Sequence, residues 1–193
     1  EVIEGARLSP SEILGSRQEP RIREQDFGNF QDVHLMKECK QQRQSFGRFF
    51  YRFPNGESGA DVYDRVSTWL ETLYRDMDYG PLDQNSTILL VTHGLVSRIF
   101  LMRWYQWSVE EFEEMYNPGN CQLLVMNRDD LRTARTYYAL SEDSMQCLQF
   151  AETTKERMVR SRQQTHIFEA SDLPIATESQ SSLPICGVLD EEP

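Results

Sequence analysis

A short apolar run followed at once by a polar turn constrains the fold more than any other stretch of this chain. Residues 88–91 read Ile-Leu-Leu-Val, an unbroken apolar run that is typical of a strand buried on both faces of a parallel sheet. His93 and Gly94 form the turn, and apolar residues then recur at helical spacing from Leu95 to Met102. Strand, turn and helix in direct succession predict an α/β fold.

Helical signals precede this unit. The polar stretch 31–44 reads as a helix, and the turn residues 54–56 (Pro-Asn-Gly) interrupt the chain after it. Ser58 with Asp61 three residues later predicts a capping box at the start of another helix. The apolar residues of that helix recur at spacings of three and four and predict its core face: Val62, Val66, Trp69, Leu70, Leu73 and Met77.

The region after the central unit predicts a mixture of helix and strands. Ser108 and Glu111 have the spacing of a second capping box, for a short acidic helix that ends near Met115. A turn is expected at 117–120 and a strand at 121–126. A turn at 127–130 would then lead into a final strand at 132–140.

Composition divides the chain near residue 141. The 193 residues carry a formal net charge of −11, and residues 141–193 hold ten acidic and four basic residues but few aromatic ones. We therefore expect a folded domain over 1–140 and a mostly disordered acidic tail over 141–193, with a short helix near 154–164 as an option. The acidic balance argues against a general nucleic-acid or anionic-membrane binder.

Other features narrow the setting of the protein. The four cysteines are widely scattered, which fits free thiols in a reducing compartment, so we expect the cytoplasm or the nucleus. The longest apolar runs are too short to cross a bilayer. The histidines lack a metal-ligand spacing such as H-x-x-x-H, so neither a metal site nor another cofactor is expected. The sequence leaves the oligomeric state open.

His93 is the histidine with the most informative position. It stands at the carboxyl end of the expected strand and at the amino end of the expected helix, where α/β sheets place ligands. Helix N–H groups there favour an anion, and a histidine adds a donor, so the position suits phosphate. The alternative, weighed equally, is a histidine that caps the helix. The other two histidines, His34 and His166, are most simply surface residues.

The segment Arg23-Glu24-Gln25-Asp26-Phe27-Gly28 is a second candidate site. A carboxyl group among apolar and aromatic neighbours can have its proton affinity adjusted so that it protonates a leaving group. Taken alone the segment also fits an ordinary surface turn.

Three segments in this order resemble the histidine phosphatase superfamily, and most of all the phosphoglycerate mutase-like proteins of plants and fungi. They are residues 23–28, residues 53–58 followed by Asp61 and Arg65, and the run Val-Thr-His-Gly at 91–94. The similarity covers roughly residues 18–140. The resemblance implies a phosphoglycerate mutase-like three-layer α/β/α sandwich and a small phosphorylated substrate.

Family members hydrolyse or transfer phosphoryl groups through a phosphohistidine. By position, His93 resembles the second, phosphate-binding histidine and Glu24 resembles the proton donor. Gly94 would let the backbone approach the phosphate, and Arg52 is a weaker candidate for substrate contact. The role of Glu57 is open between the site and the turn that begins its helix.

One family motif has no counterpart here. The family nucleophile lies in an Arg-His-Gly motif, and this sequence contains no Arg-His pair. We therefore expect the first strand and helix, the nucleophile and both phosphate arginines to lie upstream, so that the sandwich is incomplete and the chain by itself is inactive. Phosphatase chemistry is expected of the longer protein; mutase-type phosphotransfer and a catalytically dead phosphate-binding scaffold are the alternatives.

A serine hydrolase is the rival enzyme class. Residues 56–60 (Gly-Glu-Ser-Gly-Ala) nearly match G-x-S-x-G around Ser58. The fifth position is alanine, and the residues before the motif make a poor strand, so this interpretation is disfavoured.

Overall fold

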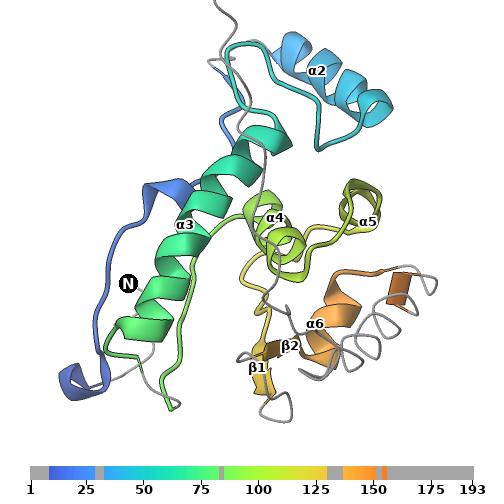
Figure 1. Ribbon diagram of the computed structural model, residues 1–193. Coiled ribbons are helices and arrows are strands. Elements are labelled where there is room, and N and C mark those ends of the chain that lie inside the picture. Colours follow the sequence, from blue (N-terminus) through green and yellow to red (C-terminus); the bar gives the residue numbers. More distant parts are fainter. Residues whose placement is uncertain (1–8, 29–32, 83–84, 130–136, 151–153, 156–193) are drawn as a thin grey trace, which may run out of the picture. The chain divides into compact units, whose positions relative to one another are not determined.

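The computed structural model describes residues 9–28, 33–82, 85–129, 137–150 and 154–155. The chain separates into two units, 1–154 and 155–193, and the elements belong to the first (Figure 1). In chain order they are the 3-10 turns η1 (Pro10–Glu12) and η2 (Pro20–Ile22), helices α2 (Val33–Phe46), α3 (Gly59–Tyr79), α4 (Gly94–Tyr105) and α5 (Val109–Glu114), strands β1 (Met126–Asp129) and β2 (Tyr137–Leu140), and helix α6 (Glu142–Cys147).

Helix α3 begins where its capping box predicts. The Ser58 hydroxyl accepts a hydrogen bond from the Asp61 N–H, and the Asp61 carboxylate accepts one from the Ser58 N–H. Together these bonds satisfy donors that every helix start leaves open. The expected core face is confirmed, because Val62, Val66, Trp69, Leu70 and Leu73 are buried, with Met77 half-buried at its end.

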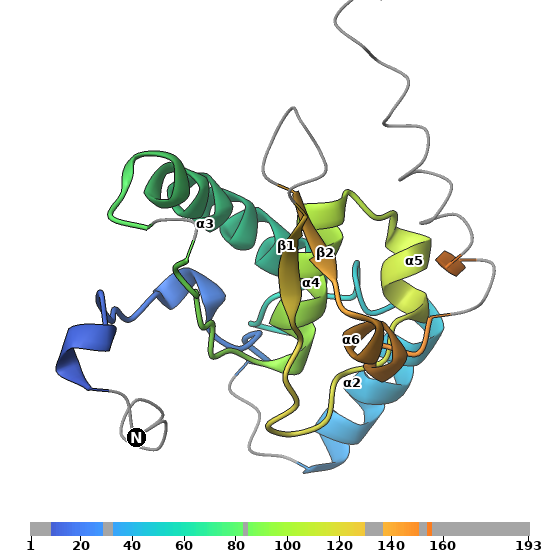
Figure 2. The same ribbon diagram turned by 90° about the horizontal axis from the view of Figure 1, so that it is seen from below.

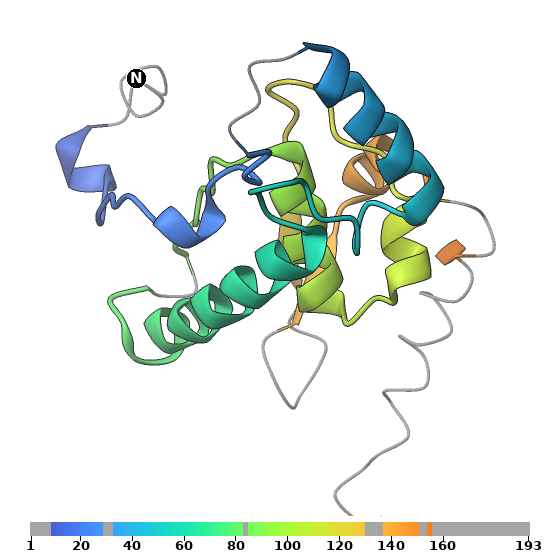
Figure 3. The same ribbon diagram turned by 90° about the horizontal axis from the view of Figure 1, so that it is seen from above.

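Helix α4 packs against α3 through aromatic side chains. The ring centroids of Trp69 and Phe100 are 5.8 Å apart, and those of Tyr74 and Trp104 are 5.2 Å apart. Figure 3 shows η2 and the segment that leads into α4 lying near each other beside α3. Because α4 is itself apolar on most sides, it lies within the core, and His93 directly precedes its first residue.

The described strands form one antiparallel pair. Met126 faces Leu140 and Asp129 faces Tyr137, and the pair lies against α4 (Figure 2), where the Tyr105 hydroxyl donates to the Tyr138 carbonyl at 2.8 Å. The expectations of a strand at 121–126 and a turn at 127–130 are therefore wrong, since 126–129 is the strand. The expected strand at 132–140 is present over 137–140, and 132–136 lies outside the described residues.

The apolar segment 88–91 does not form the buried parallel strand that its composition predicts. Leu89 is 60% exposed and Val91 is 66% exposed, and no backbone hydrogen bond joins 87–91 to another strand in the described part of the chain. A strand needs a neighbour to satisfy its backbone groups, and the described residues place none beside this one. The described residues therefore contain helices and one antiparallel pair of strands, and no parallel pair is found among them.

Order continues beyond residue 140, where we expected the domain to end. Ser141 caps α6, and Leu148 and Phe150 after it are buried. The Thr154 hydroxyl donates to the Glu114 carboxylate. The apolar side chains at 148 and 150 therefore extend the folded unit past the expected boundary. The tail over 156–193 lies outside the described residues.

Two further predictions are confirmed. Helix α2 matches the expected helix with its end two residues later, and α5 begins at the capping box formed by Ser108 and Glu111. Within the described residues, no helix is both long and apolar enough to span a membrane.

Candidate active site

Glu24 and His93 lie together although 68 residues separate them in the sequence. The His93 Nδ1 atom and the Glu24 Oε2 atom are 2.8 Å apart, and both side chains are about half exposed, at 51% and 42%. The structure thus brings together the two residues that the sequence singled out for acid and phosphate chemistry. With Nδ1 turned to the carboxylate, Nε2 is the ring nitrogen that can meet a phosphate oxygen.

His93 occupies the N-cap position of α4, but its ring does not cap the helix. No side-chain cap bond is formed, and the ring turns to Glu24 instead. The preceding Thr92 hydroxyl donates to the Ile22 carbonyl at 2.6 Å and ties the approach to α4 to the segment that carries Glu24. The His93 side chain therefore does not cap the helix. Its ring faces the Glu24 carboxylate at a helix end whose N–H groups favour anions.

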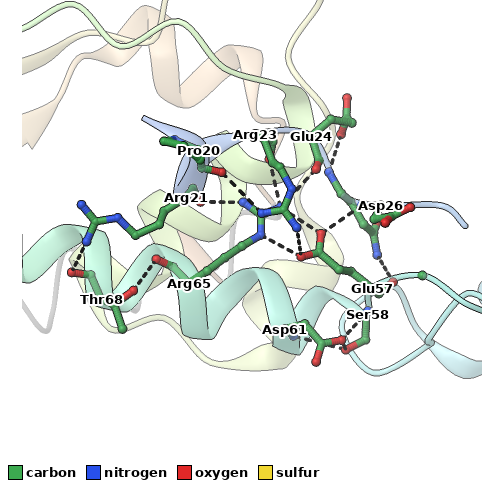
Figure 4. A network of polar contacts seen from close by, with 12 residues as sticks. Pro20, Arg21, Arg23, Glu24, Asp26, Glu57, Ser58, Asp61, Arg65 and Thr68 are labelled. Carbon is green, nitrogen blue, oxygen red and sulfur yellow. Dashed lines mark hydrogen bonds and ion pairs between the residues drawn. The ribbon is translucent and has the colours of Figure 1, made fainter. Parts of the chain in front are cut away.

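The segment that carries Glu24 is fastened to α3 by a network of charged side chains (Figure 4). The Glu57 carboxylate accepts hydrogen bonds from Arg23, Arg65 and the backbone N–H of Asp26. The Glu57 side chain is only 16% exposed and that of Arg65 only 12%. Glu57, whose role the sequence left open, therefore connects the start of α3 to the segment on either side of Glu24.

Gly94 follows His93 as the first residue of α4, and its surroundings differ from the expectation. A Cβ at this position would lie 3.0 Å from Cγ and 3.1 Å from Oδ1 of Asn117. The exposed Asn117 amide therefore lies against the helix start beside His93, and sequence reasoning missed it. Asn117 stood in an expected turn, so its only signal was turn chemistry.

The two other residues raised from the sequence lie in local contacts. Arg52 is 60% exposed, forms an ion pair with Asp61 and donates to the Gly56 carbonyl. Its contact with substrate stays a prediction. Ser58 is buried and its hydroxyl is hydrogen-bonded to Asp61, an arrangement that serves a helix cap and not a nucleophile.

Three arginines that sequence reasoning missed, Arg43, Arg48 and Arg98, lie near one another. Arg48 and Arg98 both donate to the Met115 carbonyl, at 3.3 and 2.8 Å. Burial, followed by the charges of Arg48 and Arg43, lowers the pKa of Arg98 to about 9. Burial and the charge of Arg48 lower the pKa of Arg43, which the Glu113 and Glu24 carboxylates oppose. Of the three, Arg43 lies close enough to Glu24 for the two charges to interact.

The described residues offer no metal site, because no three His, Cys, Asp or Glu side chains among them group closely enough to hold an ion.

Part of this chain is similar in sequence to known proteins. A phosphoglycerate mutase-like protein of Arabidopsis thaliana is 54% identical over 126 residues, which are 63% of this chain and 40% of that protein. The broad-range acid phosphatase of Saccharomyces cerevisiae is 50% identical over 115 residues, 59% of this chain and 34% of that protein. The chain thus spans less than half the length of these relatives. Among solved structures, a mycobacterial hydrolase is 19% identical with a TM-score of 0.48, over 65% of this chain and 63% of its own.

The family model of branch 1 of the histidine phosphatase superfamily matches residues 7–139. That range contains Glu24, Glu57, Arg65 and His93, the residues that meet in the structure although they are distant in the sequence. The chain belongs to the histidine phosphatase superfamily, whose α/β fold it shares.

Proposed function

We propose that the protein to which this chain belongs hydrolyses phosphoric monoesters of small metabolites through a phosphohistidine. The contact of 2.8 Å between His93 and Glu24 at the start of α4 carries this proposal. The yeast relative, a broad-range acid phosphatase, supports hydrolysis as the reaction type.

Each residue has a distinct role in this proposal. A histidine nucleophile attacks phosphorus and the ester P–O bond breaks, while His93 donates a hydrogen bond from Nε2 to an equatorial phosphate oxygen. Glu24, protonated, gives its proton to the leaving alkoxide. The Glu24 carboxylate then takes a proton from water as the water attacks the phosphohistidine and releases inorganic phosphate.

The nucleophile is assigned to a part of the protein outside these 193 residues. The sequence contains three histidines and no Arg-His pair, and His93 is already engaged with the proton donor. The chain by itself is therefore expected to leave p-nitrophenyl phosphate unhydrolysed, whereas the longer gene product that carries these residues is expected to turn it over.

The test compares these two proteins and their variants. His93→Ala is expected to lower kcat of the longer protein by roughly 10²- to 10³-fold, the range for losing one preorganised transition-state donor. Glu24→Gln should lower kcat on alkyl phosphates by roughly 10²- to 10⁴-fold. Turnover by the 193-residue chain that is abolished by His93→Ala would show that the nucleophile lies within it.

A phosphate-binding protein without catalysis is the second candidate, and the lack of an Arg-His pair favours it. Binding of inorganic phosphate by the longer protein, weakened by His93→Ala but without hydrolysis of any phosphomonoester in a metabolite panel, would select it. Exchange of phosphate between two sites of a phosphorylated acid, faster than its hydrolysis, would select a mutase instead.

A further inference from the structure

We propose that Arg65, acting together with Glu57, is a positioning residue that holds the Glu24 proton donor in place. This inference rests on the proposed function and goes beyond it, because it predicts which substrates depend on these two residues. Neither side chain touches the carboxyl group of Glu24 or the ring of His93 in the described contacts. Both act on the backbone that presents the carboxyl group.

Arg65 donates hydrogen bonds to the backbone before Glu24 and at Glu24 itself. Its Nη1 atom donates to the Arg21 carbonyl at 2.5 Å, and its Nη2 atom donates to the carbonyls of Arg23 and Glu24 at 2.9 and 3.2 Å. The planar guanidinium directs these bonds in a fixed fork that a lysine cannot reproduce. Because Arg65 lies in the long helix α3, the hydrogen bonds of its guanidinium attach the segment that carries Glu24 to that helix (Figure 4).

Glu57 holds the arginine and the C-terminal side of the segment at once. Its Oε1 atom accepts from Nε of Arg65 at 3.0 Å, and its Oε2 atom accepts from Nη2 of Arg65 at 3.1 Å. The same Oε2 atom accepts a hydrogen bond from the Asp26 backbone N–H at 2.9 Å. The side-chain amide of Gln25 donates to the Glu57 carbonyl at 2.8 Å. The backbone is therefore fixed on both sides of Glu24.

The Glu24 carboxyl group itself has little else to hold it. Apart from His93, its described partner is the neighbouring Gln25 N–H at 3.2 Å, and the side chain is 42% exposed. Its position therefore follows its backbone. A misplacement of about 1 Å in a catalytic group costs roughly 10²-fold in rate, so a loosened backbone should weaken proton donation.

The leaving group of the substrate determines how strongly the reaction depends on the proton from Glu24. An alkoxide is strongly basic and leaves slowly unless it is protonated, whereas p-nitrophenolate is stable and leaves without a proton. Loss of positioning at Glu24 should therefore slow phosphoryl transfer from an alkyl phosphate and spare the transfer from p-nitrophenyl phosphate. The kcat/KM value reports this first step, because it excludes the later hydrolysis of the phosphohistidine, which is common to both substrates. A residue that only stabilises the fold lowers both rates by the same factor, because unfolded molecules hydrolyse neither substrate.

The experiment measures kcat/KM for glycerol 2-phosphate and for p-nitrophenyl phosphate with the longer protein. Arg65→Lys keeps the positive charge beside Glu57 but loses the fork, and it is expected to lower the alkyl-to-aryl ratio of kcat/KM at least tenfold. Glu57→Gln is the second variant and should lower the ratio in the same direction. Because a ratio does not depend on the folded fraction, partial unfolding of either variant leaves the result interpretable.

Two comparison variants complete the design. Glu24→Gln removes the proton donor itself and should therefore lower the ratio by the largest factor. Arg17→Gln removes an exposed ion pair between Arg17 and Asp76, a residue of α3 away from Glu24. This variant should leave the ratio unchanged. An unchanged ratio in both Arg65→Lys and Glu57→Gln, beside a lowered ratio in Glu24→Gln, overturns the positioning role alone. A wild-type protein that hydrolyses neither substrate overturns the proposed function and this inference with it.

Discussion

Two glycines of the site differ in what surrounds their Cα atoms. A Cβ at Gly56 would lie 2.5 Å from the Asp26 carbonyl oxygen and 2.7 Å from the Gly28 nitrogen, both backbone atoms. A Cβ at Gly94 would meet only the exposed Asn117 side chain, at 3.0 Å. A side chain can rotate away, whereas a backbone has to be displaced. Gly56 is therefore the more constrained position.

Gly56→Ala is expected to lower the free energy of unfolding by about 2–3 kcal/mol, because the methyl group forces apart the turn and the segment after Glu24. Gly94→Ala should cost less than about 1 kcal/mol. Urea unfolding of the chain measures both values. Equal losses in the two variants would contradict the view that backbone contact distinguishes these glycines.

The ion pair between Glu19 and Arg21 makes stability depend on pH. Hydrogen bonds from Arg21 lower the pKa of Glu19 to about 2, against a partial opposition from burial. The Nε and Nη2 atoms of Arg21 each lie 2.7 Å from a Glu19 carboxylate oxygen. A carboxyl group with a lowered pKa in the folded state contributes stability above its ordinary pKa, and this contribution is lost as the pH falls toward about 2.

Glu19→Gln should therefore lower the free energy of unfolding at neutral pH by about 1 kcal/mol, a value reduced by solvent around the partly exposed Arg21. The variant should also lose less stability than the wild type as the pH falls from about 4.5 to about 2. Urea unfolding across this range measures the difference, with Glu71→Gln on the exposed face of α3 as the control. Parallel pH profiles for wild type and Glu19→Gln would be inconsistent with this pairing.

At the scale of elements, Arg98 joins α4 to α5 at an electrostatic cost. Its guanidinium carbon lies 4.8 Å from the centre of the Phe112 ring, and its Nε atom is buried without a partner among the described residues. Its pKa is lowered to about 9, chiefly by burial, so its charge opposes folding, and the opposition is relieved only as the pH rises above that value. The packing of the Arg98 side chain stabilises the fold, whereas its buried charge destabilises it.

Arg98→Met is therefore expected to change the free energy of unfolding at neutral pH by less than about 1 kcal/mol, because the methionine keeps the packing while Arg48 still donates to the Met115 carbonyl. Phe112→Ala, which empties a fully buried position, should cost about 3–5 kcal/mol. Thermal and urea unfolding compare them. A loss above about 3 kcal/mol in Arg98→Met would show that the buried charge itself is needed.

At the scale of the whole molecule, two extended segments present apolar side chains to solvent. Leu89, Val91 and Leu123 are each at least 60% exposed, and residues 87–91 have no strand partner in the described part of the chain. An extended apolar segment with free backbone groups can pair with the same segment of another molecule. The 193-residue chain is therefore expected to self-associate.

Leu89→Lys should reduce this self-association, because a charge on such a segment opposes pairing between molecules. Val33→Lys adds the same charge on the exposed face of α2, at a side chain 79% exposed, and should have no effect. Light scattering over a range of protein concentrations measures both. A wild-type chain that stays monomeric at every concentration would refute the expectation.

The sequence by itself determined helices α3, α4 and α5 and the residues at which they begin. The capping boxes of α3 and α5, the core face of α3 and the placement of His93 directly before α4 all depend on residues three or four positions apart, so local patterns predict them. The same patterns failed for 88–91 and 121–126, since a strand is decided by the neighbour it pairs with and the chain alone does not reveal that neighbour.

Only the tertiary structure decided how the candidate site is assembled. Motif resemblance pointed to Glu24 and His93 separately. Their contact closes a long loop, beside which Thr92 bonds to Ile22 and Arg65 bonds to Arg21. Those bonds end on backbone carbonyls, which every residue carries, so no residue pattern announces them. The sequence therefore supplied the reactive groups, and long-range hydrogen bonds to the backbone set their geometry.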